Sequence, residues 1–395
     1  MQKYKRIFYF ISSLYDISLA VWSGTIYLFM HQIGYTYGQI NLFLSIFWLI
    51  TFFTEIPSGY IADRLGYLKT IQISGFIRAA GLLVLAFNAC HLWVLVISGI
   101  LTALGDSLQS GTLPSWIANK AVVNKEKNKL GAIYSFYNLL STPINMVFGF
   151  IGAQLLGNID LKLPLIVGAG LLVITGVIVW PLLKYDSQNL MQKHPKVQFH
   201  LVSDVKTVIK HELTTFKLIL LLLPITFISA GPLDQWQLYF QQGKQIKSGI
   251  ILLAMGLVGM LGSLVYRKLS QKPQHELRLI SICVLLMTGT ICLTVVTRKA
   301  YYLSLALFLL HDFFGKIEQI AQDTFLQVTI ETETRRATLI SVSNALEAAV
   351  SVVILAINGY LSDHYGIGTA WISLAVVGIL LFGLAYLFKR KSSSD

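Results

Sequence analysis

The stretch Thr54-Glu55-Ile56-Pro57-Ser58-Gly59-Tyr60-Ile61-Ala62-Asp63-Arg64-Leu65-Gly66-Tyr67-Leu68-Lys69 joins two long apolar runs, at 40–53 and 71–87. Within it, Gly59 and Gly66 permit close packing or a positive φ, because glycine has no β-carbon. Asp63 is placed to accept hydrogen bonds from a helix N-terminus. The stretch therefore predicts a tight polar turn between two membrane-spanning helices.

The composition favours a helical membrane protein. The 395 residues are 55% hydrophobic and 13% charged, and the mean hydropathy is +0.65. A soluble chain of this length needs more charge to cover its surface. The net charge of +12 is typical of basic loops on one membrane side, so it does not indicate a nucleic-acid partner.

Apolar runs of about 20 residues recur along the whole chain, each long enough to cross a bilayer core of ~30 Å at about 1.5 Å per residue. They predict twelve helices, at 7–31, 39–57, 70–89, 91–117, 131–157, 163–184, 216–240, 247–266, 277–297, 300–325, 337–360 and 369–388.

The distribution of basic residues predicts the orientation of these helices. If odd-numbered helices begin in the cytoplasm, the only bases in outside segments are Lys162, Lys244, Lys247, Arg298 and Lys299. Because basic loops stay in the cytoplasm, both termini are expected there. No small-residue cleavage site follows the basic N-terminus, so the first span is expected to remain uncleaved.

The longest polar link predicts the domain organisation. It divides the chain into a six-helix bundle at 1–184, a cytoplasmic linker at 185–215 and a second six-helix bundle at 216–395. Within the linker, Ser203–Lys210 has an N-cap residue and helical apolar spacing. An amphipathic surface helix and a plain flexible linker both remain open for this segment.

The opening stretch also carries a family resemblance. Gly59, Asp63, Arg64 and Gly66, followed by Lys69, form the pattern Gly-x-x-x-Asp-Arg-x-Gly plus a base. This resembles the loop between helices 2 and 3 of the major facilitator superfamily. The preceding Glu55-Ile56-Pro57 resembles a subgroup of drug exporters. The family usually has a basic pair after the second glycine, whereas Tyr67 and Leu68 intervene here.

The resemblance implies an all-α integral membrane fold of twelve transmembrane helices in two parallel six-helix repeats. The two halves show a weak internal similarity that is consistent with such repeats, offset by about 207 residues, in which 127–129 falls against 334–336.

For function, the resemblance implies a secondary active transporter that works by alternating access. The expected activity is proton-coupled efflux of a small amphipathic or cationic molecule, as in multidrug-resistance antiporters of the bacterial plasma membrane. The expected partners are a small-molecule substrate, protons and membrane lipid, with no nucleic acid, and the protein is expected to be a monomer. A proton-coupled importer of a specific metabolite and a non-transporting receptor or scaffold remain alternatives.

The sequence offers no sign of enzyme chemistry. It has no GxxxxGK[ST] phosphate loop, which argues against direct use of ATP. Its three cysteines, Cys90, Cys283 and Cys292, show no metal-binding spacing. We therefore expect no enzyme activity, no cofactor and no metal.

Ionisable residues within the spans are candidates for substrate and proton handling, because charge is costly inside a membrane. The acids are Asp16, Glu55, Asp106, Asp234, Asp312, Glu318 and Glu347, and the bases are Arg78 and Lys316. The excess of acids favours protons and cationic or neutral substrates over anions. Asp16, Arg78, Asp106, Lys316 and Glu347 lie roughly 12–17 Å from the cytoplasmic end, counted at the helical rise.

A proton carrier must lie near the midplane and lack a fixed cation, because a permanent partner keeps it ionised. Asp106 and Asp16 have no base within a turn of their own helices, so they rank first and second, with Glu347 third. Asp312 and Lys316 stand four residues apart and either pair or stay separate. Glu318 lies on another face of the same helix.

For each of these acids, including Asp16 and Asp106, a carboxylate that is hydrogen-bonded to serine or backbone is the alternative to a coupling role. Glu55 and Asp234 lie nearer the two mouths of the transport path, where gating or solvation is expected. Arg78 is expected to brace a neighbouring helix.

Conformational gating is assigned through the resemblance. In the family, the loop aspartate braces the cytoplasmic closure against the second half of the protein. Here the nearby candidates are Arg335 and Arg336 at the start of helix 11. The gating set is therefore Glu55, Gly59, Asp63, Arg64, Gly66, Arg335 and Arg336.

Overall fold

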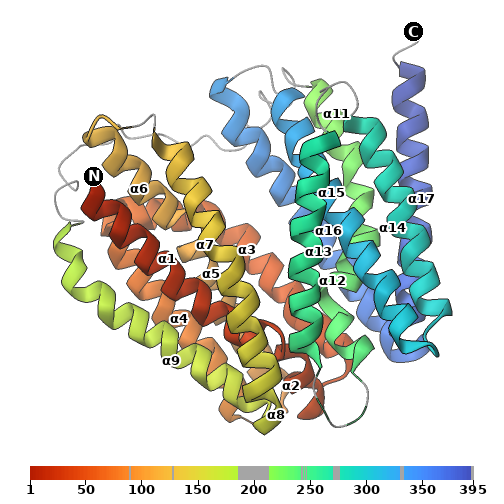
Figure 1. Cartoon of the computed structure of the whole chain (residues 1–395), viewed down its shortest axis with the longest axis horizontal. Coiled ribbons are helices and arrows are strands. Elements are labelled where there is room, and N and C mark those ends of the chain that lie inside the picture. The colour runs from red at the N-terminus through yellow and green to blue at the C-terminus, as the bar shows by residue number, and fades with distance from the viewer. Residues whose placement is uncertain are drawn as a thin grey trace. The chain divides into compact units, whose positions relative to one another are not determined.

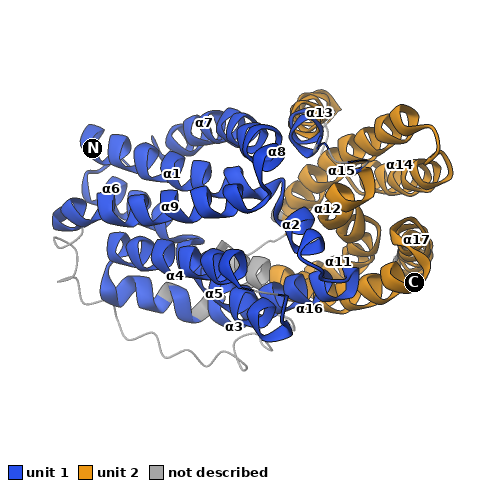
Figure 2. Cartoon of the chain, turned by 90° about the horizontal axis from the view of Figure 1, so that it is seen from below, with its two compact units in different colours: residues 1–195, 241–253 blue, residues 196–240, 254–395 orange. Residues whose placement is uncertain are grey.

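A computed structural model describes residues 1–88, 90–126, 129–185, 213–241, 243, 245, 247–269, 276–329 and 333–392. Throughout these ranges the regular structure is helical (Figure 1). Two compact units result, one formed by 1–195 with 241–253 and the other by 196–240 with 254–395 (Figure 2). The division into 1–184, 185–215 and 216–395 stays a prediction, and Ser203–Lys210 lies outside the described residues.

The first unit is built from helices of the N-terminal half. They are α1 (Gln2–Ser23), α2 (Ile26–Gln32), α3 (Tyr37–Leu65), α4 (Tyr67–Phe87), α5 (Leu92–Gln109), α6 (Thr112–Val123), α7 (Leu130–Phe150), α8 (Gly157–Ile159) and α9 (Lys162–Val179). Helix α4 packs against α5 and α9, and α1 packs against α7 and α9. One end of this unit is filled by an apolar core that includes Phe8 and Trp116.

The second unit is built from helices of the C-terminal half. They are α11 (Leu213–Leu222), α12 (Thr226–Phe240), α13 (Ser248–Leu269), α14 (Glu276–Val296), α15 (Tyr301–Thr329), α16 (Glu333–Tyr365) and α17 (Ile367–Ser392). Helix α14 packs along α15, and α17 packs against α12, α14 and α16. The first turns of α13 belong with the first unit, because Gly249 and Leu252 contact Gln154 and Gly149.

The opening stretch is helical almost to its end, which corrects the predicted helix boundary at 57. Helix α3 continues through Pro57 and Asp63 to Leu65. It ends at Gly66, whose φ of 97° is unfavourable for residues with a β-carbon. Helix α4 begins at Tyr67, so the turn between the two helices is a single residue. Polar residues such as Asp63 and Arg64 do not end the helix, because their backbones adopt helical φ and ψ angles without strain.

Some spans that were predicted as continuous helices are interrupted. The segment 7–31 breaks at Gly24 and Thr25, and the segment 91–117 breaks at Ser110 and Gly111, where Gly111 has φ +67°. Helix α7 passes into a π-helical segment at Ile151–Leu156. Hydropathy reports apolar length but not backbone geometry, so these breaks were not predicted.

Within the described residues, eleven helical segments are long and apolar enough to cross a membrane. Helix α15 has 29 residues but does not belong to these eleven. It carries Asp312, Lys316, Glu318 and Asp323, which lower its hydropathy and raise its charge. A twelfth crossing by α15 stays a prediction.

Candidate functional site

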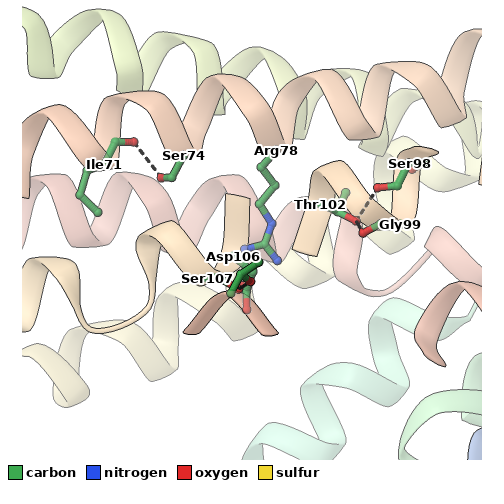
Figure 3. A network of polar contacts seen from close by, with 9 residues as sticks. Ile71, Ser74, Arg78, Ser98, Gly99, Thr102, Asp106 and Ser107 are labelled. Carbon is green, nitrogen blue, oxygen red and sulfur yellow. Dashed lines mark hydrogen bonds and ion pairs between the residues drawn. The ribbon is translucent and has the colours of Figure 1, made fainter. Parts of the chain in front are cut away.

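The first unit contains a buried ion pair between α4 and α5 (Figure 3). Arg78 Nη1 lies 2.5 Å from Asp106 Oδ1, and Arg78 is only 5% exposed. The indole ring of Trp22 on α1 lies 5.7 Å from the guanidinium carbon. The expectation that Asp106 lacks a cation partner is therefore wrong, because its partner comes from the neighbouring helix. Arg78 braces a neighbouring helix, as predicted.

Small and hydroxyl-bearing residues allow α4 and α5 to approach closely at this pair. A β-carbon at Gly105 would lie 2.6 Å from the β-carbon of Arg78 and 3.0 Å from its backbone nitrogen. Nearby, Ser98 Oγ donates to the carbonyl of Gly81 across the same interface. Close approach brings the short Asp106 side chain within reach of Arg78.

Asp16 is the second predicted proton carrier, and it has no cation partner among the described residues. The hydroxyl of Tyr137 on α7 donates to Asp16 Oδ1 at 3.1 Å, and Ser141, one turn further along α7, also interacts with the carboxylate. The other oxygen, Oδ2, is buried, and in the described part of the chain it has no hydrogen-bond partner. This carboxyl group therefore retains one unsatisfied oxygen.

In the second unit, the charged groups gather on α15. Lys316 Nζ donates to Gln319 Oε1 at 3.1 Å. Asp312 and Lys316 form no ion pair within the described ranges, although the lysine acts electrostatically on Asp312. The sequence left open whether Asp312 and Lys316 pair or stay separate, and in the structure they are separate.

Glu318 is the most deeply buried of the predicted acids of this unit. It is 5% exposed, and its Oε1 has no hydrogen-bond partner within the described segments. Glu347 on α16 and Asp323 on α15 lie close enough to act on it electrostatically. Glu347 Oε1 accepts a hydrogen bond of 3.0 Å from Gln322. Glu318 thus lies within electrostatic reach of two further carboxylates.

Asp323 was missed by the sequence analysis. The sequence spacing could have predicted its position. Asp312, Lys316, Gln319 and Asp323 recur at intervals of three and four residues and so share one helical face. Asp323 lies two residues before the predicted end of this helix, at 325.

A second missed feature is a polar stripe on α7, formed by Asn138, Ser141, Thr142 and Asn145. These residues also recur at intervals of three and four within a span that is otherwise apolar.

Asp234 is half-buried on α12. Its neighbour Gln235 accepts a hydrogen bond from Trp371 Nε1 at 3.2 Å and donates to Ser362 Oγ at 3.1 Å. This buried polar network joins α12, α16 and α17. Asp234 therefore adjoins a structural network of the second unit.

At the opening stretch, Asp63 accepts a hydrogen bond of 2.6 Å from Tyr67 Oη. Tyr67 Oη in turn accepts one of 2.9 Å from Asn119 Nδ2 on α6. Arg64 lies over the ring of Tyr60 at 4.5 Å. Gly66, which precedes α4, has no side chain that could cap this helix.

The other gating candidates cannot be placed in the same detail. The side-chain surroundings of Glu55, Gly59, Arg335 and Arg336 lie outside the described part of the structure, although their backbones belong to α3 and α16. For metals, no group of three or more His, Cys, Asp or Glu residues in the described ranges could hold an ion.

Comparison with known proteins places these features in a family. The model of the Major Facilitator Superfamily matches residues 8–332. A segment of 115 residues is 29% identical to the uncharacterised MFS-type transporter YxaM of Bacillus subtilis (strain 168), and it spans 29% of each chain.

Solved structures share the fold over nearly the whole chain. The nucleoside transporter NupG is 14% identical, with a TM-score of 0.76 over 97% of this chain and 98% of that one. A bacterial homologue of the iron transporter ferroportin, in its inward-facing state, is 16% identical, with a TM-score of 0.75 over 100% of both chains. The POT family transporter PepTSo is 11% identical, with a TM-score of 0.74 over 100% of this chain and 99% of that one.

At these identities, the solved structures establish likeness of fold alone. The family match, in contrast, covers most of the chain, and it agrees with the Gly-x-x-x-Asp-Arg-x-Gly pattern at residues 59–66. The chain belongs to the Major Facilitator Superfamily of membrane transporters.

Proposed function

We propose that this protein is a secondary active transporter that works by alternating access and couples the movement of a small molecule to protons. The proposed direction is efflux, with protons entering as the substrate leaves. The proposal includes twelve membrane crossings, of which α15 is one, and cytoplasmic termini in a bacterial plasma membrane.

One observation carries the proton coupling: the buried carboxyl group of Glu318. Its Oε1 has no hydrogen-bond partner within the described part of the chain, and the nearby charges that act on it are the carboxylates of Glu347 and Asp323. A buried carboxylate without a cation is strongly disfavoured, so such a group takes up a proton. Release requires a second conformation in which water or a cation reaches it.

The two units differ in how their central charges are compensated. In the first unit, Arg78 neutralises Asp106, and Asp16 is the uncompensated acid of the two whose side-chain surroundings the structure describes. In the second unit, the central charged residues are one base and four acids: Lys316, Asp312, Glu318, Asp323 and Glu347. This asymmetry favours the second unit as the principal site of proton uptake, with Glu318 ahead of Asp16.

Alternating access supplies the coupling. If transport requires Glu318 to be neutral in one state and ionised in the other, each cycle carries one proton across with the conformational change. The hydrogen bond from Gln322 to Glu347 would hold the Glu347 carboxylate in place beside Glu318. The acids thus provide a proton site without any need for ATP.

The test uses purified protein in liposomes that contain a pH-sensitive dye and are screened against a panel of candidate substrates. A substrate of the wild-type protein should drive proton movement and should itself be accumulated by an imposed pH gradient. The Glu318→Gln variant should lose gradient-driven accumulation but retain exchange of labelled for unlabelled substrate, because exchange moves no net proton.

Asp160→Asn is a matched control, because it removes an exposed carboxylate that lies between two spans. It should leave both activities unchanged. If Glu318→Gln still accumulates substrate with the wild-type pH dependence, Glu318 is not the carrier. The direction of the pH gradient that drives accumulation separates efflux from import.

A further inference from the structure

Helix α7 has two exposed faces of opposite character. Phe136, Leu139 and Val147 form an exposed apolar face. Asn138, Thr142 and Asn145 are also exposed, with Ser141 half-buried beside them. At 100° per residue, the centres of the two faces lie roughly 150° apart. The helix is therefore amphipathic across a segment that is long and apolar enough to span a membrane.

The polar face lies at mid-depth of this span. Its residues are 8 to 15 positions after the start of α7 at Leu130, which corresponds to roughly 12–22 Å along the helix. The apolar face suits lipid. Exposed amide groups do not, because hydrocarbon satisfies none of their hydrogen bonds. The polar face is therefore expected to border water or a bound polar molecule.

Hydrogen bonds within the helix satisfy only part of this face. Thr142 Oγ1 donates to the carbonyl of Asn138 at 3.1 Å. Asn145 Nδ2 donates to the carbonyl and to the hydroxyl of Ser141, at 2.9 and 3.1 Å. Each side-chain amide carries two N–H donors and an oxygen with two acceptor sites, so two asparagines have capacity beyond these contacts.

The polar face carries no charge of its own. The nearest acid of the predicted set, Asp16, is hydrogen-bonded to Tyr137 through Oδ1, and its Oδ2 is buried. An organic cation would therefore find no exposed carboxylate to pair with on this face. A lipophilic ligand would cover the amide groups without satisfying their hydrogen bonds. The chemistry that fits is a set of neutral hydrogen-bond donors and acceptors.

From this face we infer that Asn138, Ser141, Thr142 and Asn145 bind an uncharged, hydrogen-bonding substrate, such as a nucleoside, sugar or polyol, rather than a lipophilic cation. This inference rests on the proposed transport function and names its substrate class. Ser141 belongs to the polar face and also interacts with Asp16. It therefore connects bound substrate to an uncompensated acid of the same unit.

The test measures binding and exchange with four probes. Uridine and myo-inositol are uncharged hydrogen-bonding molecules, tetraphenylphosphonium is a lipophilic cation, and dialanine is a zwitterion. Wild-type protein in liposomes should exchange at least one uncharged probe. Asn138→Leu and Asn145→Leu should each weaken its binding tenfold or more, because each removes donors and acceptors that face the probe.

Leu139→Ala on the apolar face of the same helix is the matched control and should bind the probe as wild type does. Binding of tetraphenylphosphonium or dialanine, but of neither uncharged probe, would overturn the inference. So would unchanged affinity in both asparagine variants, provided that they elute as folded monodisperse protein.

The two proposals fail in different ways. Net transport of an uncharged probe down its own concentration gradient without any proton movement would contradict proton coupling but support this substrate class. Proton movement driven by tetraphenylphosphonium alone would support coupling and overturn the substrate class.

Discussion

Arg78 on α4 and Asp106 on α5 are joined by an ion pair of 2.5 Å in the interior of the first unit. The arginine is almost fully buried, whereas the aspartate side chain is 29% exposed. The two partners therefore differ in what happens when the other is removed. A guanidinium left alone in the interior keeps its charge, whereas a partly exposed carboxylate left alone still meets water.

We expect Asp106→Leu to destabilise the protein more than Arg78→Leu does. Removing one partner of a buried ion pair typically costs about 3–5 kcal/mol, and the cost should be greater where arginine is left alone. Thermal unfolding in detergent, followed by the loss of monodisperse protein, measures this order.

The double variant Arg78→Leu/Asp106→Leu should recover part of the lost stability, because it leaves no unpaired charge. A double variant that is less stable than either single variant would show that the pair is not the reason for the losses. The milder Asp106→Asn should keep the pH dependence of transport, since a paired carboxylate is a poor proton carrier.

Gly105 is expected to tolerate no side chain. In Gly105→Ala, the added methyl group would collide with the β-carbon and backbone of Arg78. Overpacking of this kind typically costs about 1–3 kcal/mol. The expected result is a lower unfolding temperature in detergent. Gly170→Ala on α9 is the control, because apart from the adjacent residues and backbone of its own helix no atom of the described structure lies within 4 Å of its added methyl group. An equal loss in both variants would contradict the packing argument.

The family and the helical class could be predicted from the sequence because each rests on signals that are local in the chain. Long apolar runs report membrane spans by length alone, and residues 59–66 carry the family pattern. The ends and breaks of helices were harder to predict from the sequence. The predicted boundary falls at Pro57, yet the helix continues through this residue to Leu65 and ends at Gly66. A single proline removes one hydrogen bond, whereas a positive φ is incompatible with the helix.

The candidate site was less predictable, because it depends on contacts between helices. Asp106 was ranked first since no base lies within a turn of its own helix, but Arg78 stands 28 positions earlier and reaches it from α4. The donation from Tyr137 to Asp16 spans 121 positions. Periodicity places residues on one face of a helix, but it does not show which helix packs against that face.

The base asymmetry predicts a topology that cysteine labelling can check. In a background without Cys90, Cys283 and Cys292, Ser187→Cys and Ser392→Cys should resist an impermeant thiol reagent in intact cells. Gln242→Cys and Tyr365→Cys should react, because they follow odd-numbered crossings and Tyr365 is 64% exposed. Labelling of Ser392→Cys from outside would contradict the twelve-helix count. As a control, every introduced cysteine should react with the reagent in permeabilised cells.

The last prediction concerns the chain of hydrogen bonds from Asn119 through Tyr67 to Asp63. Tyr67 stands where the family usually has a base, and its hydroxyl ties the end of α3 to α6. Family resemblance assigns the loop aspartate a role in cytoplasmic closure. We therefore expect Asp63→Asn and Tyr67→Phe to slow transport without loss of folding or membrane insertion.

Removal of one such hydrogen bond typically costs about 0.5–1.5 kcal/mol, which corresponds to a few-fold to roughly tenfold change in a rate. Because both residues act through the same bond, the double variant should be no slower than the slower single variant. Tyr60→Phe is the control, since it keeps the aromatic ring under Arg64 and removes only a hydroxyl. If Tyr67→Phe transports at the wild-type rate while Asp63→Asn is slow, then Asp63 acts through another partner. The start of α16 would then be the next place to search, because the resemblance points to Arg335 and Arg336.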